Sequence, residues 1–327
     1  MTRSEHETET LIRDSLDRLA ARAPDGDAVR TALTRAGRKQ RPGARLALVA
    51  AAVVVVVAGV IAGTQAFTTT SGLVPAAGRP VLGYSPGRLP GGFTEQYREG
   101  GPGTAPQVRR WFAGPAEITL SAYSTADPAW SQTALRIASL RDQILVHGRV
   151  AMVTGDTGGA ALLTWLADDD HVLTVRVDGV PDARTVAQRI AEDVTPAPVG
   201  VRGELRFGAL PAGLAERSAA VKGTGPADAS TELTAADPAR PSVPAVRVTA
   251  SAGSPGVNGA APVTVRGGPG FFVAPKNGEQ AMVAVRLPSG RWLTVAGPRP
   301  EAELVAVADG VQLDPSPDYR WLGRATS

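Results

Sequence analysis

Three aspartates and a histidine stand together at Asp168, Asp169, Asp170 and His171, and this run has the side chains best suited to chemistry. Carboxylate and imidazole groups ligate divalent cations, so the run resembles a metal site. The same composition is typical of a hairpin turn between two apolar strands. A related segment further along the chain has Pro-Ser-Gly-Arg at the matching positions 288–291, which makes an equally good turn without metal ligands. We therefore expect a turn here and no bound metal.

The other candidates for catalysis are isolated in the sequence. His6 and His147 have no Ser or Asp at a spacing typical of a catalytic triad. The glycine clusters at residues 155–159 and 267–270 lack the strand and helix context of a phosphate-binding loop, so they predict turns. The sequence therefore predicts a protein that is not an enzyme, with no catalytic residue and no cofactor.

Composition limits the folds that could position these groups. The chain has 327 residues, with 34 Lys plus Arg against 31 Asp plus Glu. This near balance of charge argues against a protein that coats nucleic acid, and we expect no direct nucleic-acid binding. The 43% of hydrophobic residues can fill more than one core. The absence of cysteine excludes disulfides and cysteine-ligated zinc or iron–sulfur centres.

Residues 46–67 contain the most apolar run of the chain. Residues 46–63 carry no charge, and a helix of that length spans roughly 27 Å, close to the hydrocarbon core of a bilayer. Because basic residues precede the run, the positive-inside rule places the N-terminus in the cytoplasm. We expect an uncleaved signal anchor, hence a single-pass cell-membrane protein with extracytoplasmic C-terminal domains; a cleavable signal peptide is the alternative. The membrane-flanking basic residues are Arg35, Arg38, Lys39, Arg41 and Arg45.

Residues 1–45 predict a cytoplasmic arm of two short amphipathic helices. Apolar side chains recur at helical spacing along each helix, but they are too few to form a core of their own. The arm therefore either binds a protein partner or is a solvated tail whose basic end meets anionic lipid headgroups. The residues expected to contact a partner are Leu11, Ile12, Leu16, Leu19, Val29 and Leu33.

Short motifs found between residues 89 and 175 recur in the same order between residues 210 and 295. The motif Leu-Pro-x-Gly at residues 89–92 returns at residues 210–213, and Leu-Thr-Val at residues 173–175 returns at residues 293–295. A nearly constant offset of about 120 residues indicates two tandem domains. The expected organisation is a linker over residues 68–80, copy 1 over 81–198, copy 2 over 199–317 and a tail over 318–327.

Each copy is expected to be an antiparallel sheet covered by a helix. Short apolar segments on either side of a polar turn predict a strand pair at residues 161–166 and 172–177, and a second pair at 281–287 and 292–296. Helices are predicted at residues 182–193 and 300–309, since each begins with proline and an acidic residue. This order of elements predicts an α+β fold.

The layout resembles that of single-pass membrane proteins from high-GC Gram-positive bacteria that act as anti-sigma regulators. The resemblance is carried by residues 11–33 of the arm, the basic stop at residues 38–45, and the segment 162–194. It implies exported domains that bind an envelope ligand and cytoplasmic helices that hold a partner such as a sigma factor. Zinc-binding anti-sigma domains have two cysteine ligands, so this chain cannot be of that type.

Two functions remain open from the residues alone. The first is a membrane-anchored regulatory or sensor protein with a ligand on its exported side and a protein partner on its cytoplasmic side. The second is an envelope-facing structural or ligand-binding module with a passive cytoplasmic tail.

Overall fold

The structure is a computed structural model that describes residues 73–75, 80–138, 144–155, 159–276 and 279–325. These residues belong to one compact unit, Thr70–Ser327. Among them, 49% lie in strands and 13% in helices. The fold is therefore dominated by antiparallel β-sheet.

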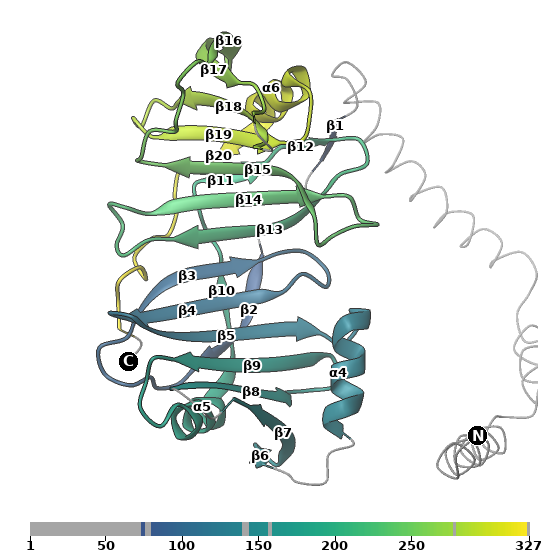
Figure 1. The fold of residues 1–327 in the computed structure, drawn as a ribbon, viewed down its shortest axis with the longest axis vertical. Coiled ribbons are helices and arrows are strands. Elements are labelled where there is room, and N and C mark those ends of the chain that lie inside the picture. Colours follow the sequence, from purple (N-terminus) through teal and green to yellow (C-terminus); the bar gives the residue numbers. More distant parts are fainter. Residues whose placement is uncertain (1–72, 76–79, 139–143, 156–158, 277–278, 326–327) are drawn as a thin grey trace, which may run out of the picture. The chain divides into compact units, whose positions relative to one another are not determined.

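Within the described residues, fourteen strands form a single sheet and follow one another like the rungs of a ladder (Figure 1). The first seven, in spatial order, are β3 (Thr94–Gly100), β4 (Gln107–Ala113), β5 (Ala116–Ser124), β9 (His171–Asp178), β8 (Ala160–Leu166), β7 (Arg149–Thr154) and β6 (Ile144–Val146). The other seven are β13 (Ala215–Lys222), β14 (Ser230–Ala236), β15 (Pro244–Ser251), β19 (Trp292–Gly297), β18 (Ala281–Arg286), β17 (Gly268–Val273) and β16 (Ala261–Val265).

The two halves of the sheet meet where β13 pairs with β3. This pairing joins Ala219 to Gly100 at one end and Lys222 to Tyr97 at the other. Counted outward from this pair, the strands run β3, β4, β5, β9, β8, β7, β6 in one half and β13, β14, β15, β19, β18, β17, β16 in the other. The two halves therefore have the same strand order on either side of the pair. The hydrogen-bonded ladder passes without interruption from one half into the other.

Three short strand pairs and two helices pack on the sheet. The strand pairs are β2 (Val81–Pro86) with β10 (Val194–Gly200), β11 (Leu205–Phe207) with β20 (Val311–Leu313), and β1 (Leu73–Pro75) with β12 (Ala209–Pro211). Helix α5 (Ala183–Glu192) packs on β8 and β9, and α6 (Glu301–Gly310) packs on β18 and β19. A further helix, α4 (Pro128–Ala138), contacts β5, β7 and β8.

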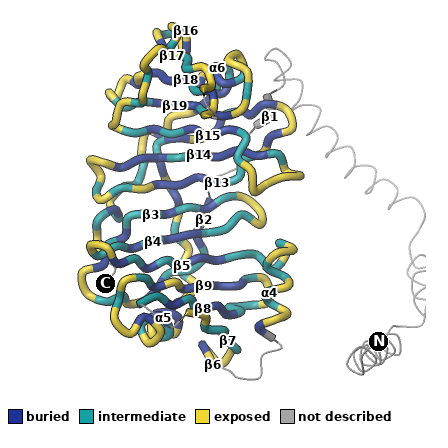
Figure 2. The backbone as a smooth tube through the Cα atoms, viewed as in Figure 1, coloured by how far each residue is buried: buried dark blue, intermediate teal, exposed yellow. Residues whose placement is uncertain are grey.

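Alternation along the strands explains how this assembly is held together. In β9, Leu173, Val175 and Val177 share one face because successive side chains point to opposite sides. They are at most 1% exposed and pack with Trp111 and Trp165 in the core of the first half. Buried positions run through the strands and exposed ones gather in the turns (Figure 2). A second core, formed by the other half, is built from β13–β19, α6 and the strands β11, β12 and β20.

Backbone hydrogen bonds attach the C-terminal segment to the junction of the two halves. Gly323 N donates to Glu95 O at 2.9 Å, and Glu95 N donates to Arg324 O at 3.0 Å. Leu322 is 3% exposed in a third small core with Leu82 and Val221. Residues 318–325, predicted as part of a tail, thus pack beside β3 as turns and loop, and Ala325 makes a single bridge to Thr94.

The predicted α+β class with two tandem helix-plus-sheet domains is wrong. The described chain is mostly antiparallel sheet, its three helices account for a small share of it, and the predicted helix-plus-sheet repeats are not seen. The physical reason is the β13–β3 pairing, which continues the backbone ladder from the first half into the second. The individual hairpins and helices were predicted near their observed positions; their assembly was not.

The predictions of a signal anchor and of a single-pass cell-membrane protein also need correction. None of the helices in the described ranges combines the length and apolar character that a membrane crossing requires. The expected span at residues 46–67 and the basic residues before it lie outside the described residues. Of the predicted linker, residues 73–75 form β1 and pair with β12.

Candidate ligand-binding site

A pocket of about 370 Å³ opens where four elements of the first half converge. Its walls come from β2, from the β6–β7 hairpin, from the β8–β9 hairpin and from β10. This volume falls within the range of roughly 300–1,000 Å³ that is usual for small-molecule sites. The pocket is therefore large enough for an organic ligand.

The floor of the pocket is apolar because it is part of the core. Val146, Trp165 and Leu173 line it and are 0%, 1% and 1% exposed. Trp165 stands opposite Leu173 in the β8–β9 register and opposite Ala151 in β7, so two ladders hold its backbone in place. A ligand in contact with these residues would be in contact with rigid apolar surface.

One side of the pocket carries a chain of polar groups. The Tyr84 hydroxyl donates to Asp168 Oδ2, and His171 Nδ1 lies 2.9 Å from Asp168 Oδ1. The backbone N–H of Asp170 donates to Asp168 Oδ1 at 2.8 Å. The Tyr84 and His171 rings meet edge to face with centroids 5.5 Å apart. Asp168 thus holds an aromatic hydroxyl and an imidazole in fixed orientations.

The surroundings of Asp168 keep it ionised. Partial burial opposes the charge, but the hydrogen bonds from Tyr84 and His171 outweigh it and hold the pKa of Asp168 below its ordinary value. Burial, followed by the hydrogen bond to Asp168, raises the pKa of Tyr84, so its hydroxyl stays protonated. Because the ionised carboxylate of Asp168 can only accept, the hydrogen bond between it and His171 is donated by Nδ1–H of His171.

The mouth of the pocket is formed by a tight turn. His147 and Gly148 connect β6 to β7 with φ angles of 51° and 74°, the left-handed pair of a type I′ hairpin. His147 and Arg149 are both exposed at the rim. Arg149 lies 3.7 Å from Asp169, a contact between solvent-exposed groups that contributes little to stability.

The predicted turn at residues 168–171 is confirmed. Ala167 N donates to His171 O at 3.0 Å, and β8 and β9 pair on either side. Across the described ranges, no group of three or more His, Cys, Asp or Glu side chains is arranged to hold a metal ion. The six arm residues predicted to bind a partner, and the five basic residues beside the predicted span, lie outside the described residues.

Sequence reasoning missed the partners of the turn. Tyr84 lies 84 residues before Asp168 and belongs to β2, and nothing in either local pattern links them. His147 had been set aside as an isolated histidine, yet it lines the same pocket as Asp168. A signal that could have suggested the hairpin at His147 was the following glycine, since a two-residue turn with positive φ favours glycine.

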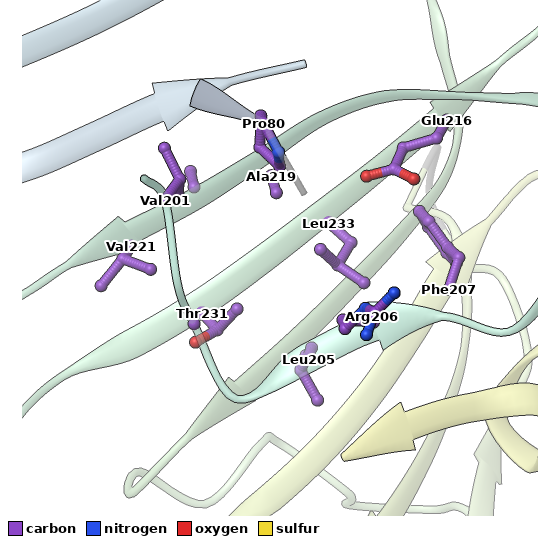
Figure 3. A pocket seen from close by; sticks show the side chains of 12 residues that line it. Pro80, Val201, Leu205, Arg206, Phe207, Glu216, Ala219, Val221, Thr231 and Leu233 are labelled. Atoms are coloured by element: carbon purple, nitrogen blue, oxygen red, sulfur yellow. The ribbon is translucent and has the colours of Figure 1, made fainter. Parts of the chain in front are cut away.

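A second cavity lies between β11 and the sheet, and it is much smaller. It holds only about 20 Å³, enough for a water molecule, and Leu205, Phe207 and Leu233 are among its walls (Figure 3). The Glu216 carboxylate reaches toward this space, with Arg206 on the facing strand (Figure 3). Burial raises the pKa of Glu216 to about 7, an effect that Arg206 partly opposes. This cavity is too small to be a ligand site.

Fold and pocket together define an antiparallel β-sheet protein with a ligand-sized apolar pocket in its first half. No family model matches the chain, and no curated protein matches it. Among solved structures, the crystal structure of MucB is similar over 72% of this chain and 93% of that chain, with 14% sequence identity and a TM-score of 0.20. A likeness at this TM-score carries no argument about fold or function.

Proposed function

We propose that this protein is a regulatory binding protein whose β-sheet body holds a small, largely apolar ligand in the pocket beside Asp168. The observation that carries the proposal is the combination in one cavity of a rigid apolar floor and a single polar wall. Sites of this kind bury the body of a ligand and fix its orientation with one or two hydrogen bonds.

The polar wall sets the ligand's chemistry. Asp168 already accepts hydrogen bonds from Tyr84, His171 and the Asp170 N–H. Of these groups, the Asp168 carboxylate and the Tyr84 hydroxyl line the pocket, so a ligand would meet an acceptor on Asp168 or the hydroxyl of Tyr84. We propose a ligand with an apolar body and one hydroxyl or amide group.

Binding rather than catalysis fits the arrangement of these side chains. A histidine oriented by an aspartate acts as a catalytic base when it also contacts a nucleophile. In the part of the chain that the structure describes, His171 makes its side-chain hydrogen bonds to Asp168 alone. In this proposal the hydrogen bonds among Tyr84, Asp168 and His171 hold Tyr84 and Asp168 in position on the pocket wall.

The regulatory half of the proposal rests on the sequence resemblance to anti-sigma regulators. In that proposal the arm at residues 1–45 binds a protein partner such as a sigma factor through its apolar stripe, and the ligand in the body modulates this binding. Leu16 and Leu19 would be central, because their spacing would place them on one face of the predicted helix.

Ligand binding is tested with a neutral fluorescent probe, N-phenyl-1-naphthylamine, titrated into the full chain. Thr195 is an exposed residue of β10 on the pocket wall, and Thr195→Trp would fill the opening. We expect the probe to bind the unaltered protein at least tenfold more tightly than this variant. Thr264→Trp makes the same change at an exposed position of β16 and is the matched control. Equal probe binding by all three proteins would reject the pocket as the ligand site.

Partner binding is tested by co-purification from the source cells. Changing both Leu16 and Leu19 to Asp alters the charge by two units and should abolish recovery of the partner. Arg18→Asp alters the charge by the same amount, lies outside the apolar stripe of the predicted helix and should leave recovery intact. If the double variant recovers the same proteins as the control, the arm does not bind through this stripe.

A further inference from the structure

Four arginines gather around a third cavity, at the junction of the two halves. Arg98 comes from β3 and Arg109 from β4, whereas Arg320 and Arg324 come from the C-terminal segment. The cavity has a volume of about 440 Å³ and is lined largely by these side chains and by Trp321. It is distinct from the pocket beside Asp168, because the two share no lining residue.

Two of the arginines are buried and stand directly opposite each other. Arg98 and Arg109 are register partners across the β3–β4 ladder and are 9% and 5% exposed. Like charges at such a position destabilise a sheet unless an anion lies between them. Glu95, which is 4% exposed, supplies it: its Oε1 accepts from both Nε atoms, at 2.8 Å from Arg98 and 2.7 Å from Arg109.

One carboxylate cannot neutralise two guanidinium groups. Asp318 adds a second negative charge, paired with Arg320 at 2.9 Å. Four arginines against Glu95 and Asp318 leave the cavity with two positive charges in excess. Positive charge concentrated in a concave surface attracts anions, and the attraction is strongest where water is partly excluded.

Several guanidinium nitrogens of the arginines that line this cavity remain available as donors. Arg109 uses its Nε and both terminal nitrogens on Glu95, Ser85 and the Tyr84 carbonyl. Arg98 binds Glu95 through Nε and Nη2, which leaves Nη1 with no hydrogen bond inside the described ranges. The guanidinium of Arg324 likewise makes no hydrogen bond or ion pair there, and Arg320 has Nη1 to spare.

Arg98 is also fixed in orientation before any ligand arrives. Its guanidinium carbon lies 4.1 Å from the centre of the Trp321 ring, and Trp321 Nε1 donates to Asp318 O at 2.9 Å. Stacking on an indole and a bidentate pair with Glu95 leave this side chain little rotational freedom. A preorganised donor costs less conformational entropy when it binds.

We propose that this cavity binds the phosphoryl group of a small molecule. A phosphoryl group is a dianion for much of the time near neutral pH, which matches the excess of two positive charges. Its oxygens point in several directions and can accept from donors on three separate residues, Arg98, Arg320 and Arg324, whereas a carboxylate presents two oxygens in one plane. The cavity also exceeds the size of a phosphate ion, so there is room for the organic part of a phosphate ester.

The test is calorimetric titration of the full chain at constant ionic strength with phenyl phosphate, inorganic phosphate and succinate. We expect both phosphate compounds to bind and succinate to bind at least tenfold more weakly. Tighter binding of phenyl phosphate would identify an ester as the ligand class, and equal binding would identify free phosphate. Absence of phosphate binding, or succinate binding as tight as phosphate, would overturn the proposal.

Variants locate the binding. Arg324→Gln should weaken phosphate binding at least tenfold, and Arg324→Lys should restore part of it because it keeps the charge without the planar fork. Arg324 is exposed, so folding should be unchanged, which circular dichroism checks. Arg286→Gln removes an exposed arginine from β18, five strands away from β3 in the sheet, and is the control. Equal affinities for Arg324→Gln and Arg286→Gln would place the anion elsewhere and overturn the proposal.

Discussion

The carboxyl group of Glu216 should make the protein less stable as pH rises from about 4.5 to about 7. Burial raises its pKa from an ordinary value of 4.5 to about 7, so the folded state binds a proton in this range that the unfolded state has lost. Stability falls with pH wherever the folded state binds more protons. The loss is complete above the folded-state pKa.

The magnitude follows from the difference between the two pKa values. A difference of about 2.5 pH units, at about 1.36 kcal/mol per unit, sets an upper limit of roughly 3.4 kcal/mol. Glu216 is only half-buried, since it also lines an open groove, so solvent screens part of this effect. We expect a loss of about 1–2 kcal/mol in the free energy of unfolding.

Replacing Glu216 by Gln removes the titration. Because the amide is neutral at every pH, Glu216→Gln should match the unaltered protein near pH 4.5 and be more stable by about 1–2 kcal/mol at pH 8. Urea denaturation of the full chain at pH 5, 6, 7 and 8 measures this difference. Glu279→Gln, at an exposed carboxylate, is the control and should give no pH-dependent difference. A Glu216→Gln difference that stays constant or shrinks with rising pH would refute the reasoning.

Three further substitutions test other parts of the structure. Glu95→Gln should lower the free energy of unfolding by about 3–5 kcal/mol, because it leaves two buried guanidinium groups without an anion, and urea denaturation measures the loss. The hydrogen bonds from those arginines outweigh burial and lower the pKa of Glu95, so the stability it contributes should persist at neutral pH and disappear as pH falls below about 4. If the variant lost as much unfolding free energy at low pH as the unaltered protein does, this reasoning would be contradicted. Asp168→Asn should cost about 1 kcal/mol, since its side chain is 46% exposed, and should weaken probe binding by freeing Tyr84; unaltered probe affinity would show that the polar wall does not shape the pocket. Gly101→Ala should destabilise strongly, by about 2 kcal/mol or more, because the added Cβ would meet a carbonyl oxygen at 1.9 Å, whereas Gly91→Ala meets nothing within 4 Å and should be neutral in thermal denaturation; equal melting temperatures would contradict this contact.

Local patterns in the sequence were informative about single hairpins. The run at residues 160–178 has a short apolar segment on either side of an acidic turn, and the structure has β8, the turn and β9 there. Helix α5 follows within two residues of its predicted start and end. These features depend on neighbours a few residues apart, which is why periodicity and turn composition reveal them.

The fold class could not be predicted in this way. The fold class depends on whether β3, at the edge of one half, is left unpaired or pairs with β13, at the edge of the other. These two strands are more than 110 residues apart in the chain. Any strand offers the same backbone donors and acceptors, so no motif marks the partner it will choose. The tandem motifs suggested two separate domains because the sequence carries no sign of this shared ladder.

The same limit applies to both candidate sites. The sequence by itself determined the hairpins, the turn at Asp168 and the lack of any thiol chemistry, because each depends on residue type and short spacing. Only the tertiary structure brought Tyr84 to Asp168, and Arg324 to the buried pair of Arg98 and Glu95. Charge and hydrogen-bonding chemistry act through space over a few ångströms, and the long-range strand pairing sets which side chains come that close.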